Sequence, residues 1–203
     1  TAYEIRNCDW SSDVCSSDLT KAVKAAKSAP PGKPLPAQML DLITAYWTSQ
    51  MVFVVAKLGV ADHMKKGAKP VAELAAAVGA DAQRLHRVLR ALAPSGLFVE
   101  KGSGRFALTE LGSTLRSDVP FSMRNFALMM VDDYNWKSWE KLLDGVTQPS
   151  TPFEAVLGCK IFEYLHGHPD KLKVFAESMS SISGAECPAI AAGDRKSTRL
   201  NSS

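Results

Sequence analysis

The first apolar stretch of the chain runs over Met39–Leu58 and predicts a long helix. Leu40, Ile43 and Trp47 recur at the spacing of one helix face, with threonine and glutamine as polar relief. Over Met51–Ala56 every residue is apolar, so a helix here has no face suited to water. A short domain rarely surrounds its own first helix, and we therefore expect a second subunit to cover part of it.

Two short helical patterns follow, with a tight turn between them. Pro70 suits a first helical position, and apolar residues at helical spacing from Val71 to Val78 mark the first helix. Gly79 is placed to end it, and Asp81 is a typical cap for the second. The stripe of the second helix consists of Leu85, Val88, Leu89 and Leu92. The two patterns together predict a helix-turn-helix.

A β-hairpin is predicted next. Residues 97–100 and 105–108 are apolar enough for short strands, and the glycine-rich residues 101–104 between them form a turn. Pro94 should end the preceding helix after Ala93. A helix-turn-helix followed by a hairpin has the order of a winged helix.

The remainder of the chain predicts helices only. Their expected ranges are 110–117, 121–131, 135–145, 152–165 and 169–191, with breaks at prolines. Strands do not alternate with helices, so a doubly wound nucleotide-binding sheet is not expected in this chain. The predicted fold class is therefore mainly α: a winged helix-turn-helix with one small β-hairpin, flanked by further helices.

The two ends lack apolar periodicity. Residues 1–19 and 194–203 resemble translated sequencing adapter, and we expect them to lie outside the fold, with 1–19 disordered. Residues 20–37 contain five prolines or glycines at 30–36 and predict a linker.

Composition excludes several classes of function. The chain has 24 basic and 21 acidic residues; without its two ends, 20 basic and 16 acidic residues remain, a net charge of +4. This excess is too mild to indicate nucleic acid or an anionic membrane as partner. Cys159 and Cys187 are the cysteines between the ends, too few for a disulfide framework. The run Met51–Ala56 is far shorter than the roughly 20 residues of a membrane helix, so we expect no membrane partner and a reducing, cytoplasmic location.

The candidate chemical motifs are weak. The Gly102–Gly104 segment lies in a hairpin turn, whereas a phosphate-binding loop joins a strand to a helix. The His166–His168 segment with Cys159 lacks a fourth ligand for structural zinc, and a loop before a proline is the simpler interpretation. Asp132 and Asp133 are adjacent, so in a helix they point about 100° apart and cannot share a site. We predict no catalytic residue and no metal site in this chain.

A basic stripe on the second helix raises the alternative of DNA binding. In a DNA-binding winged helix this helix enters the major groove, where arginines contact phosphates or guanine. The stripe consists of Arg84, His86, Arg87 and Arg90, with Lys101 and Arg105 in the hairpin. Glu100 offsets part of the charge, and a solvated polar face explains the stripe equally simply. A winged-helix transcriptional regulator is therefore the second hypothesis, and a stand-alone helical interaction module the third.

Three segments resemble one family of enzymes. LHRVLRALAPSGLFVEKGSGRFALTELGSTLRSD (85–118) is similar to the winged-helix segment of the caffeate, hydroxyindole and bacterial polyketide O-methyltransferases. WKSW (136–139) and FEYLHGHPDKLKVFAESM (162–179) resemble the substrate-side helices of that family. The resemblance covers roughly 38–193.

The resemblance implies the following organisation. Residues 38–118 would form a winged-helix domain that makes a homodimer, and residues 119–193 would form the linking and substrate-side helices. The family binds S-adenosylmethionine in a C-terminal α/β domain that also carries a histidine base. The matching sequence ends near Ala192, so we expect the cofactor loop and the base to lie outside this chain, and the chain alone to be inactive.

The resemblance also implies site residues. Phe175 and Met179 match positions that line the pocket of the small-molecule acceptor, and Tyr164 matches an aromatic on the cofactor side. Ile182 stands where some plant members have histidine, which argues against a plant phenolic acceptor. Without the family, Phe175, Met179 and Ile182 would simply be one core stripe of a helix. The implied reaction is methyl transfer from S-adenosylmethionine to a hydroxyl of a small aromatic molecule.

Overall fold

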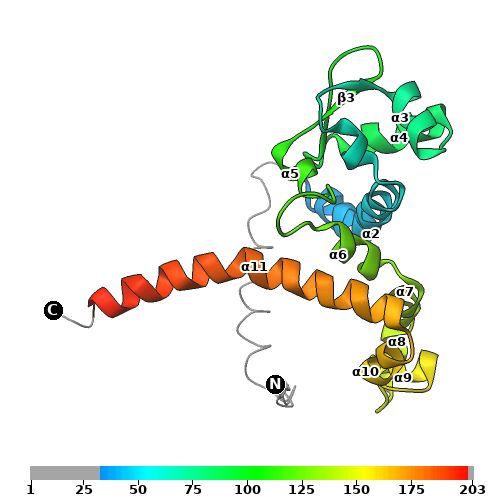
Figure 1. Ribbon diagram of the computed structural model, residues 1–203. Coiled ribbons are helices and arrows are strands. Elements are labelled where there is room, and N and C mark those ends of the chain that lie inside the picture. Colours follow the sequence, from blue (N-terminus) through cyan, green and yellow to red (C-terminus); the bar gives the residue numbers. More distant parts are fainter. Residues whose placement is uncertain (1–32, 201–203) are drawn as a thin grey trace. The chain divides into compact units, whose positions relative to one another are not determined.

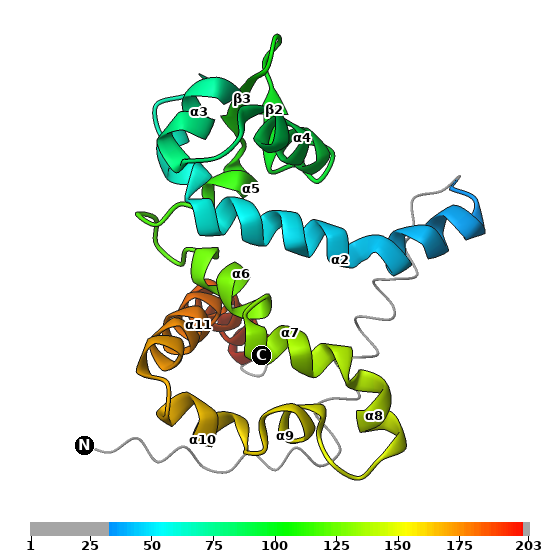
Figure 2. The same cartoon turned by 90° about the vertical axis from the view of Figure 1, so that its right-hand side faces the viewer.

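The computed structural model describes the backbone of residues 33–200 and the side chains of residues 33–184. Residues up to Ala45 and residues from Tyr46 onward belong to two separate units. The described residues are mostly helical, with one small antiparallel sheet (Figures 1 and 2). This confirms the predicted mainly α class. The predicted adapter-like segment 1–19 lies outside the described residues.

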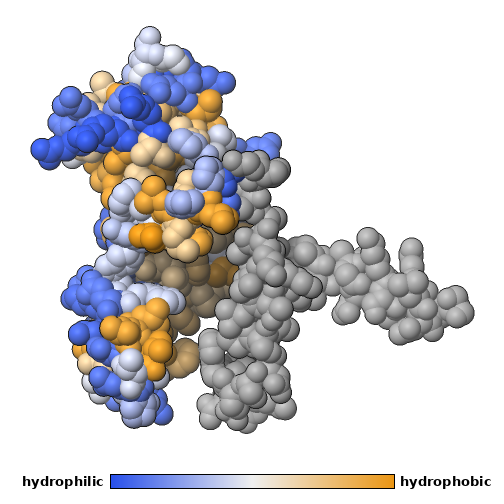
Figure 3. Space-filling view, turned by 180° about the vertical axis from the view of Figure 1, so that it is seen from behind, coloured by the Kyte–Doolittle hydropathy of each residue, from blue (hydrophilic) through white to orange (hydrophobic). Residues whose placement is uncertain are grey.

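The long first helix, α2 (Leu35–Leu58), begins inside the segment that we predicted to be a linker. Pro36 does not prevent this, because proline is tolerated in the first turn of a helix, where no backbone N–H needs a partner within the helix. Of its residues only Val55 and Ala56 are buried. By length and composition alone α2 is also apolar enough to cross a membrane. Figure 3 shows apolar side chains at the surface of the molecule.

The predicted pair of short helices is present. After the 3₁₀ helix η1 (Val60–Met64), α3 (Val71–Val78) ends at Gly79, whose φ of 68° is left-handed. Asp81 caps α4 (Ala82–Leu92), and its carboxylate accepts a hydrogen bond of 2.8 Å from the backbone N–H of Arg84. The α4 helix ends before Pro94, as predicted.

The sheet has one strand more than predicted. The hairpin strands β2 (Phe98–Glu100) and β3 (Arg105–Leu108) pair with Phe98 opposite Leu108, and β1 (Lys69–Pro70) pairs with the other edge of β3. Pro70 is therefore the extended N-cap of α3 and not its first helical residue, which corrects our prediction. Proline suits this outer strand, because an edge position does not require its missing N–H.

These elements enclose the first apolar cluster. Phe98 and Phe106 from the sheet and Leu74, Leu89 and Leu92 from the helices are almost completely buried in it. The burial of one face of α4 and one side of β3 explains why the helical and the alternating patterns were visible in the sequence.

Short helices follow the sheet, and several differ from the predicted ranges. They are α5 (Glu110–Ser113), α6 (Arg124–Met130), α7 (Asp133–Glu140), α8 (Leu142–Thr147), α9 (Pro152–Leu157) and α10 (Ile161–His166). The predicted helix 135–145 is two helices separated at Lys141, and 152–165 is divided where Gly158 adopts a left-handed φ of 72°. Neither dividing segment contains a proline, so the apolar spacing alone predicted two continuous helices.

The last helix, α11 (Pro169–Leu200), packs against α6. It continues past residue 191, our predicted end, into the segment that we interpreted as adapter-like. Arg195, Lys196 and Arg199 are compatible with this, because arginine and lysine are good helix formers. At its other end, α11 and the neighbouring helices enclose a second apolar cluster around Tyr134 and Leu165.

Candidate functional site

The second apolar cluster is built from aromatic rings. Tyr134 of α7 is only 2% exposed, and its ring lies 6.2 Å from that of Phe153 and 5.6 Å from that of Tyr164. The rings of Phe153 and Tyr164 are themselves 6.0 Å apart at a steep angle of 80°. Edge-to-face contacts of this kind stabilise a cluster beyond the area that it buries. Three helices, α7, α9 and α10, are held together here.

Tyr164 was predicted to lie on the cofactor side, and in the structure it belongs to this cluster. Its ring stacks on the imidazole of His168 with 4.1 Å between the ring centroids. Nδ1 of His168 is 2.7 Å from the backbone oxygen of Tyr164. The His166–His168 segment thus contains the end of α10 and the turn before Pro169, as the sequence suggested. Among the side chains of residues 33–184, no three His, Cys, Asp or Glu gather as metal ligands.

Phe175 and Met179, the predicted acceptor residues, both pack against the same cluster from α11. The ring of Phe175 meets that of Phe162 edge to face at 6.0 Å. The two predicted residues are four apart, so they lie on one face of α11. Ser178 next to them is completely buried, and its hydroxyl donates a hydrogen bond to the backbone oxygen of Val174. The structure therefore brings Tyr164, Phe175 and Met179 to one cluster.

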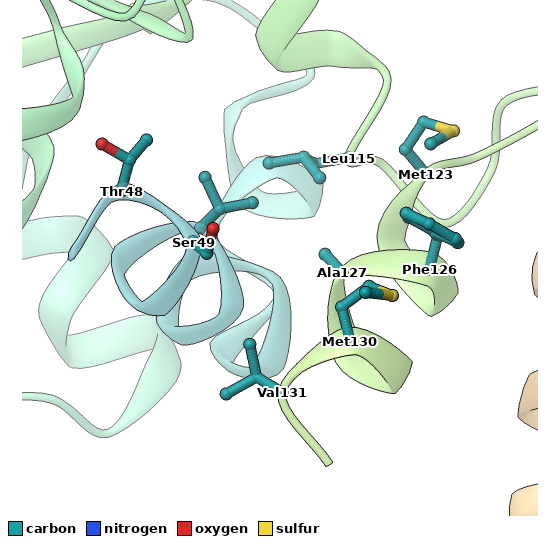
Figure 4. A pocket seen from close by; sticks show the side chains of 9 residues that line it. Thr48, Ser49, Leu115, Met123, Phe126, Ala127, Met130 and Val131 are labelled. Carbon is teal, nitrogen blue, oxygen red and sulfur yellow. The ribbon is translucent and has the colours of Figure 1, made fainter. Parts of the chain in front are cut away.

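An apolar pocket of about 250 Å³ adjoins this cluster, between α2 and α6 (Figure 4). Phe126 and Met130 of α6 line the pocket and also pack in the cluster with Phe175 and Met179. Thr48 and Ser49 of α2 are its polar side chains. The other residues that line it are Val52, Leu115, Met123, Ala127 and Val131. An apolar cavity with a few hydroxyl groups is typical of a site for a small aromatic molecule.

The sequence analysis did not find this pocket. Phe126, Met129 and Met130 are only a short apolar run in the sequence, and nothing in their spacing distinguishes a pocket wall from a core. Thr48 was interpreted as polar relief on a helix face, and Ser49 was not singled out. What brings these residues together is the packing of α6 beside α2, which is a tertiary feature. In the structure the backbone oxygen of Ala56 accepts a 2.9 Å hydrogen bond from Nε of Arg124, at the start of α6.

A more polar pocket of about 340 Å³ is lined by residues of α2, α6 and α11 and shares Val131 with the first pocket. Lys171 forms an ion pair with Asp132 there, and its ammonium group is 5.3 Å from the centre of the Tyr134 ring. Asp133 instead pairs with Lys137, one turn later in α7. The two adjacent aspartates therefore have different partners, as their spacing predicts, although Asp132 is not on a fully solvated face. Each carboxylate is paired with a lysine, so the two aspartates do not act together as a general acid and a general base.

The environment of Tyr134 gives a prediction about alkaline pH. Burial, then the negative charge of Asp132 and the neighbouring Tyr164, raise the pKa of the Tyr134 phenol to about 12. The folded protein thus holds this proton more tightly than the unfolded chain, in which the phenol titrates near pH 10. The resulting stabilisation is complete below pH 10 and is lost as the pH rises through 12. We expect the wild type to lose about 2 kcal/mol more unfolding free energy over this range than Tyr134→Phe.

Urea unfolding at several pH values measures this difference. Tyr46→Phe is the matched control, because Tyr46 is 52% exposed; this variant should follow the wild type. If Tyr134→Phe shows the same alkaline loss as the wild type, burial does not raise the pKa of this phenol.

The face of α4 that suggested DNA binding is partly engaged within the chain. Nε2 of His86 is 3.4 Å from the Glu100 carboxylate, and the guanidinium group of Arg105 donates a 2.8 Å hydrogen bond to the backbone oxygen of Ala68. Arg105 therefore holds the edge strand β1 in place. The guanidinium group of Arg105 therefore makes a structural contact within the chain rather than one with a DNA phosphate.

The chain is similar to known O-methyltransferases. Residues 40–118 match the O-methyltransferase dimerisation domain. The chain is 42% identical over 147 residues to the phenazine O-methyltransferase PhzM of Lysobacter antibioticus, a match that covers 72% of this chain and 43% of the relative. It is 29% identical to the mitomycin biosynthesis 6-O-methyltransferase of Streptomyces lavendulae, over 75% of this chain and 44% of that protein.

Solved structures give the same result. The crystal structure of LaPhzM matches with a TM-score of 0.74 and 39% identity, over 78% of this chain and 48% of that one. The O-methyltransferase NcsB1, in complex with S-adenosylmethionine and 2-hydroxy-5-methyl naphthoic acid, matches with a TM-score of 0.58 and 33% identity, over 71% and 45%. The chain spans less than half the length of these relatives. Residues 40–118 of the chain are thus similar to the O-methyltransferase dimerisation domain, the family whose model they match.

Proposed function

We propose that this chain is the dimerisation and acceptor-binding portion of an enzyme that transfers a methyl group from S-adenosylmethionine to a hydroxyl of a small aromatic molecule. The match of residues 40–118 to the dimerisation domain carries the proposal. The apolar pocket between α2 and α6 supports an aromatic acceptor. Phe175 and Met179 do not line it, but Phe126 and Met130, which do, pack against the same cluster as these two residues. The same comparisons argue against the alternative of a DNA-binding regulator.

The domain division proposed for the chain follows from this function. Residues 38–118 form a winged helix that is used for association of two copies, and residues 119–193 form the linking and substrate-side helices. The exposed apolar side chains of α2 then meet a second copy in the cytoplasm and do not enter a membrane. The matched domain begins at residue 40, within α2, which supports this assignment.

We infer that S-adenosylmethionine is bound by a part of the enzyme outside the residues that match the relatives. Among residues 33–200, no glycine-rich loop leads from a strand into a helix, the arrangement that binds nucleotides in α/β domains. The residues present therefore do not form the cofactor site. Tyr164 is proposed as the aromatic of this chain that lies nearest to the cofactor side.

The contribution of this chain to the reaction is positioning and exclusion of water. A flat acceptor in the pocket would have its ring fixed by apolar contacts with Phe126 and Met130, beside the cluster that contains Phe175 and Met179, and flexible methionines adapt to its outline. Holding a reacting hydroxyl in one orientation removes much of the entropic part of a bimolecular barrier. Thr48 or Ser49 would hydrogen-bond a polar substituent on the acceptor ring.

A chimera tests the proposal. Residues 33–184 replace the corresponding part of the Lysobacter phenazine O-methyltransferase, and methyl transfer to a hydroxyphenazine is followed by mass spectrometry. We expect a dimeric, active chimera, whereas the chain alone should neither bind S-adenosylmethionine nor transfer methyl groups. Transfer to nitrogen alone would contradict the proposed acceptor atom; a relative that is 30% identical is a phenazine-1-carboxylate N-methyltransferase. A folded but inactive chimera would contradict the proposed acceptor site.

Met179→Ala in this chimera separates a pocket wall from a core residue. As a pocket wall, Met179 contacts the acceptor in both the ground and the transition state, so its loss should raise KM and change kcat little. The apolar contact is worth about 1–3 kcal/mol, which corresponds to a KM raised by roughly 5- to 150-fold. Leu157→Ala, in α9 of the same cluster, is the control and should lower the melting temperature without changing KM. A Met179→Ala variant with lower stability and normal KM would remove Phe175 and Met179 from the site.

A further inference from the structure

An exposed apolar face lies outside the matched dimerisation domain. We call it the α7–α8 face, and it consists of Trp139, Leu142, Leu143 and Val146. Leu143 and Val146 are 74% and 76% exposed, and Trp139 is 58% exposed. Figure 3 shows apolar area at the surface of the segment that carries α8, α9 and α10. Four large apolar side chains on two consecutive short helices are more than the scattered single residues that a soluble surface ordinarily shows.

This face is continuous with the dimerisation helix. Tyr46 of α2 is itself half exposed, and its ring lies 6.5 Å from that of Trp136 in α7. Trp139 follows Trp136 at a spacing of three residues, on the same side of α7, and Leu142, Leu143 and Val146 lie in α8, directly after the bend at Lys141. Trp47 and Val54 add further exposed apolar surface on α2. The apolar surface of the dimerisation domain therefore extends across Tyr46 and Trp136 onto α7 and α8.

We propose that the α7–α8 face is part of the homodimer interface and receives α2 of the second copy. This rests on the homodimer proposed above. In a twofold interface each surface meets its complement on the partner, and the reciprocal contact occurs as well. If α2 of each copy lies on the α7–α8 face of the other, the exposed apolar surfaces of α2 and of the α7–α8 face are buried in both copies.

The course of α11 argues against the other occupant, a domain that follows this chain in longer relatives. Figure 1 shows α11 starting beside α10 and running away from α8, α9 and α10. By Gly184 it has reached Phe121, three residues before the start of α6. Polypeptide that follows α11 therefore starts on the side remote from the α7–α8 face, whereas α2 of a second copy has no such restriction.

The test compares dimer dissociation constants by sedimentation equilibrium. Leu143→Lys and Val146→Lys place charges in the face, and because both side chains are largely exposed, neither should disturb the fold. We expect each to raise the dissociation constant at least tenfold. Gln148→Lys adds the same charge just after α8, at an exposed position outside the face, and should leave the constant unchanged. Circular dichroism verifies that the variants are folded.

Two outcomes are kept apart by this design. If the wild type is monomeric at all concentrations, the proposed homodimer is wrong. If the wild type is dimeric and Leu143→Lys and Val146→Lys dimerise equally well, the homodimer stands and the role of the α7–α8 face is wrong.

A photo-crosslink on the otherwise unchanged sequence identifies the occupant. With p-benzoylphenylalanine at position 143 in mixed light and heavy protein, we expect crosslinks to residues 46–58 of the other copy. Crosslinks between copies that map only to other segments would overturn the assignment of α2 as the occupant.

Discussion

Gly112→Ala should remove a large part of the free energy of unfolding, although it adds only one methyl group. A Cβ at Gly112 would lie 2.0 Å from the backbone oxygen of Leu97 and 3.1 Å from a methyl carbon of Leu108. The same Leu97 oxygen accepts hydrogen bonds from the N–H and the hydroxyl of Thr109, the cap of α5. It therefore cannot move away without loss of these bonds.

The expected cost of Gly112→Ala is about 3 kcal/mol, at the upper end for overpacking, after the gain of about 1 kcal/mol in helix propensity. For a domain of this size the melting temperature should fall by roughly 6–12 °C. Thermal unfolding followed by circular dichroism measures it.

Gly184→Ala is the matched control. Its Cβ would lie equally close, 2.0 Å, to another atom, but that atom belongs to the ring of Phe121. Phe121 is 52% exposed, so its ring can turn into solvent at little cost. We expect a change of less than about 1 kcal/mol, because alanine also favours the helix. Equal destabilisation by both substitutions would show that the backbone around Leu97 yields as easily as an exposed ring.

The local features of the fold were the ones that the sequence could predict. Asp81 and Gly79 act through hydrogen bonds or a φ angle of their own residue and its near neighbours. The hairpin turn is of the same kind, since Gly102 and Gly104 adopt the positive φ angles that glycine permits. Such signals do not depend on the rest of the chain, and all of them were identified correctly.

The non-local features could not be predicted in this way. Strand β1 is two residues long, and its pairing with β3 joins Lys69 to Phe106, far apart in sequence. The ion pair of Lys171 with Asp132 and the hydrogen bond from Arg124 to Ala56 also link distant segments. Contacts between distant segments leave no periodic pattern in the sequence. The pocket between α2 and α6 depends on them, so only the family resemblance directed attention to the neighbouring Phe175 and Met179.

The helix boundaries show an intermediate case. The pattern from 135 to 145 is apolar at helical spacing, yet Lys141 leaves the helical region with a φ of −97° and a ψ of 15°. The bend divides α7 from α8, so that Tyr134 stays in the second cluster while Leu143 and Val146 remain exposed. A single straight helix would satisfy the same pattern, and the difference arises from packing with α9.

Phe106→Ala should produce the other large effect, because Phe106 occupies the centre of the first cluster. It lies in β3, the middle strand of the sheet, is completely buried, and its ring meets the imidazole of His86 edge to face at 5.5 Å. Truncation removes apolar contacts and leaves a cavity. Because β3 is paired with a strand on each side, it cannot move to close the cavity, and we expect a cost of about 3–5 kcal/mol. Most single domains have only about 5–15 kcal/mol of stability in total.

Urea unfolding should therefore show a midpoint for Phe106→Ala that is far below that of the wild type, with a similar slope. Val99→Ala provides the control from the neighbouring strand, since Val99 is 37% exposed and faces away from the cluster; it should change the unfolding free energy by less than about 1 kcal/mol. Phe106→Leu keeps most of the volume and should recover much of the loss. A midpoint for Phe106→Ala close to that of Val99→Ala would mean that the sheet does not anchor the first cluster, and the dimerisation domain would then depend on its helices alone.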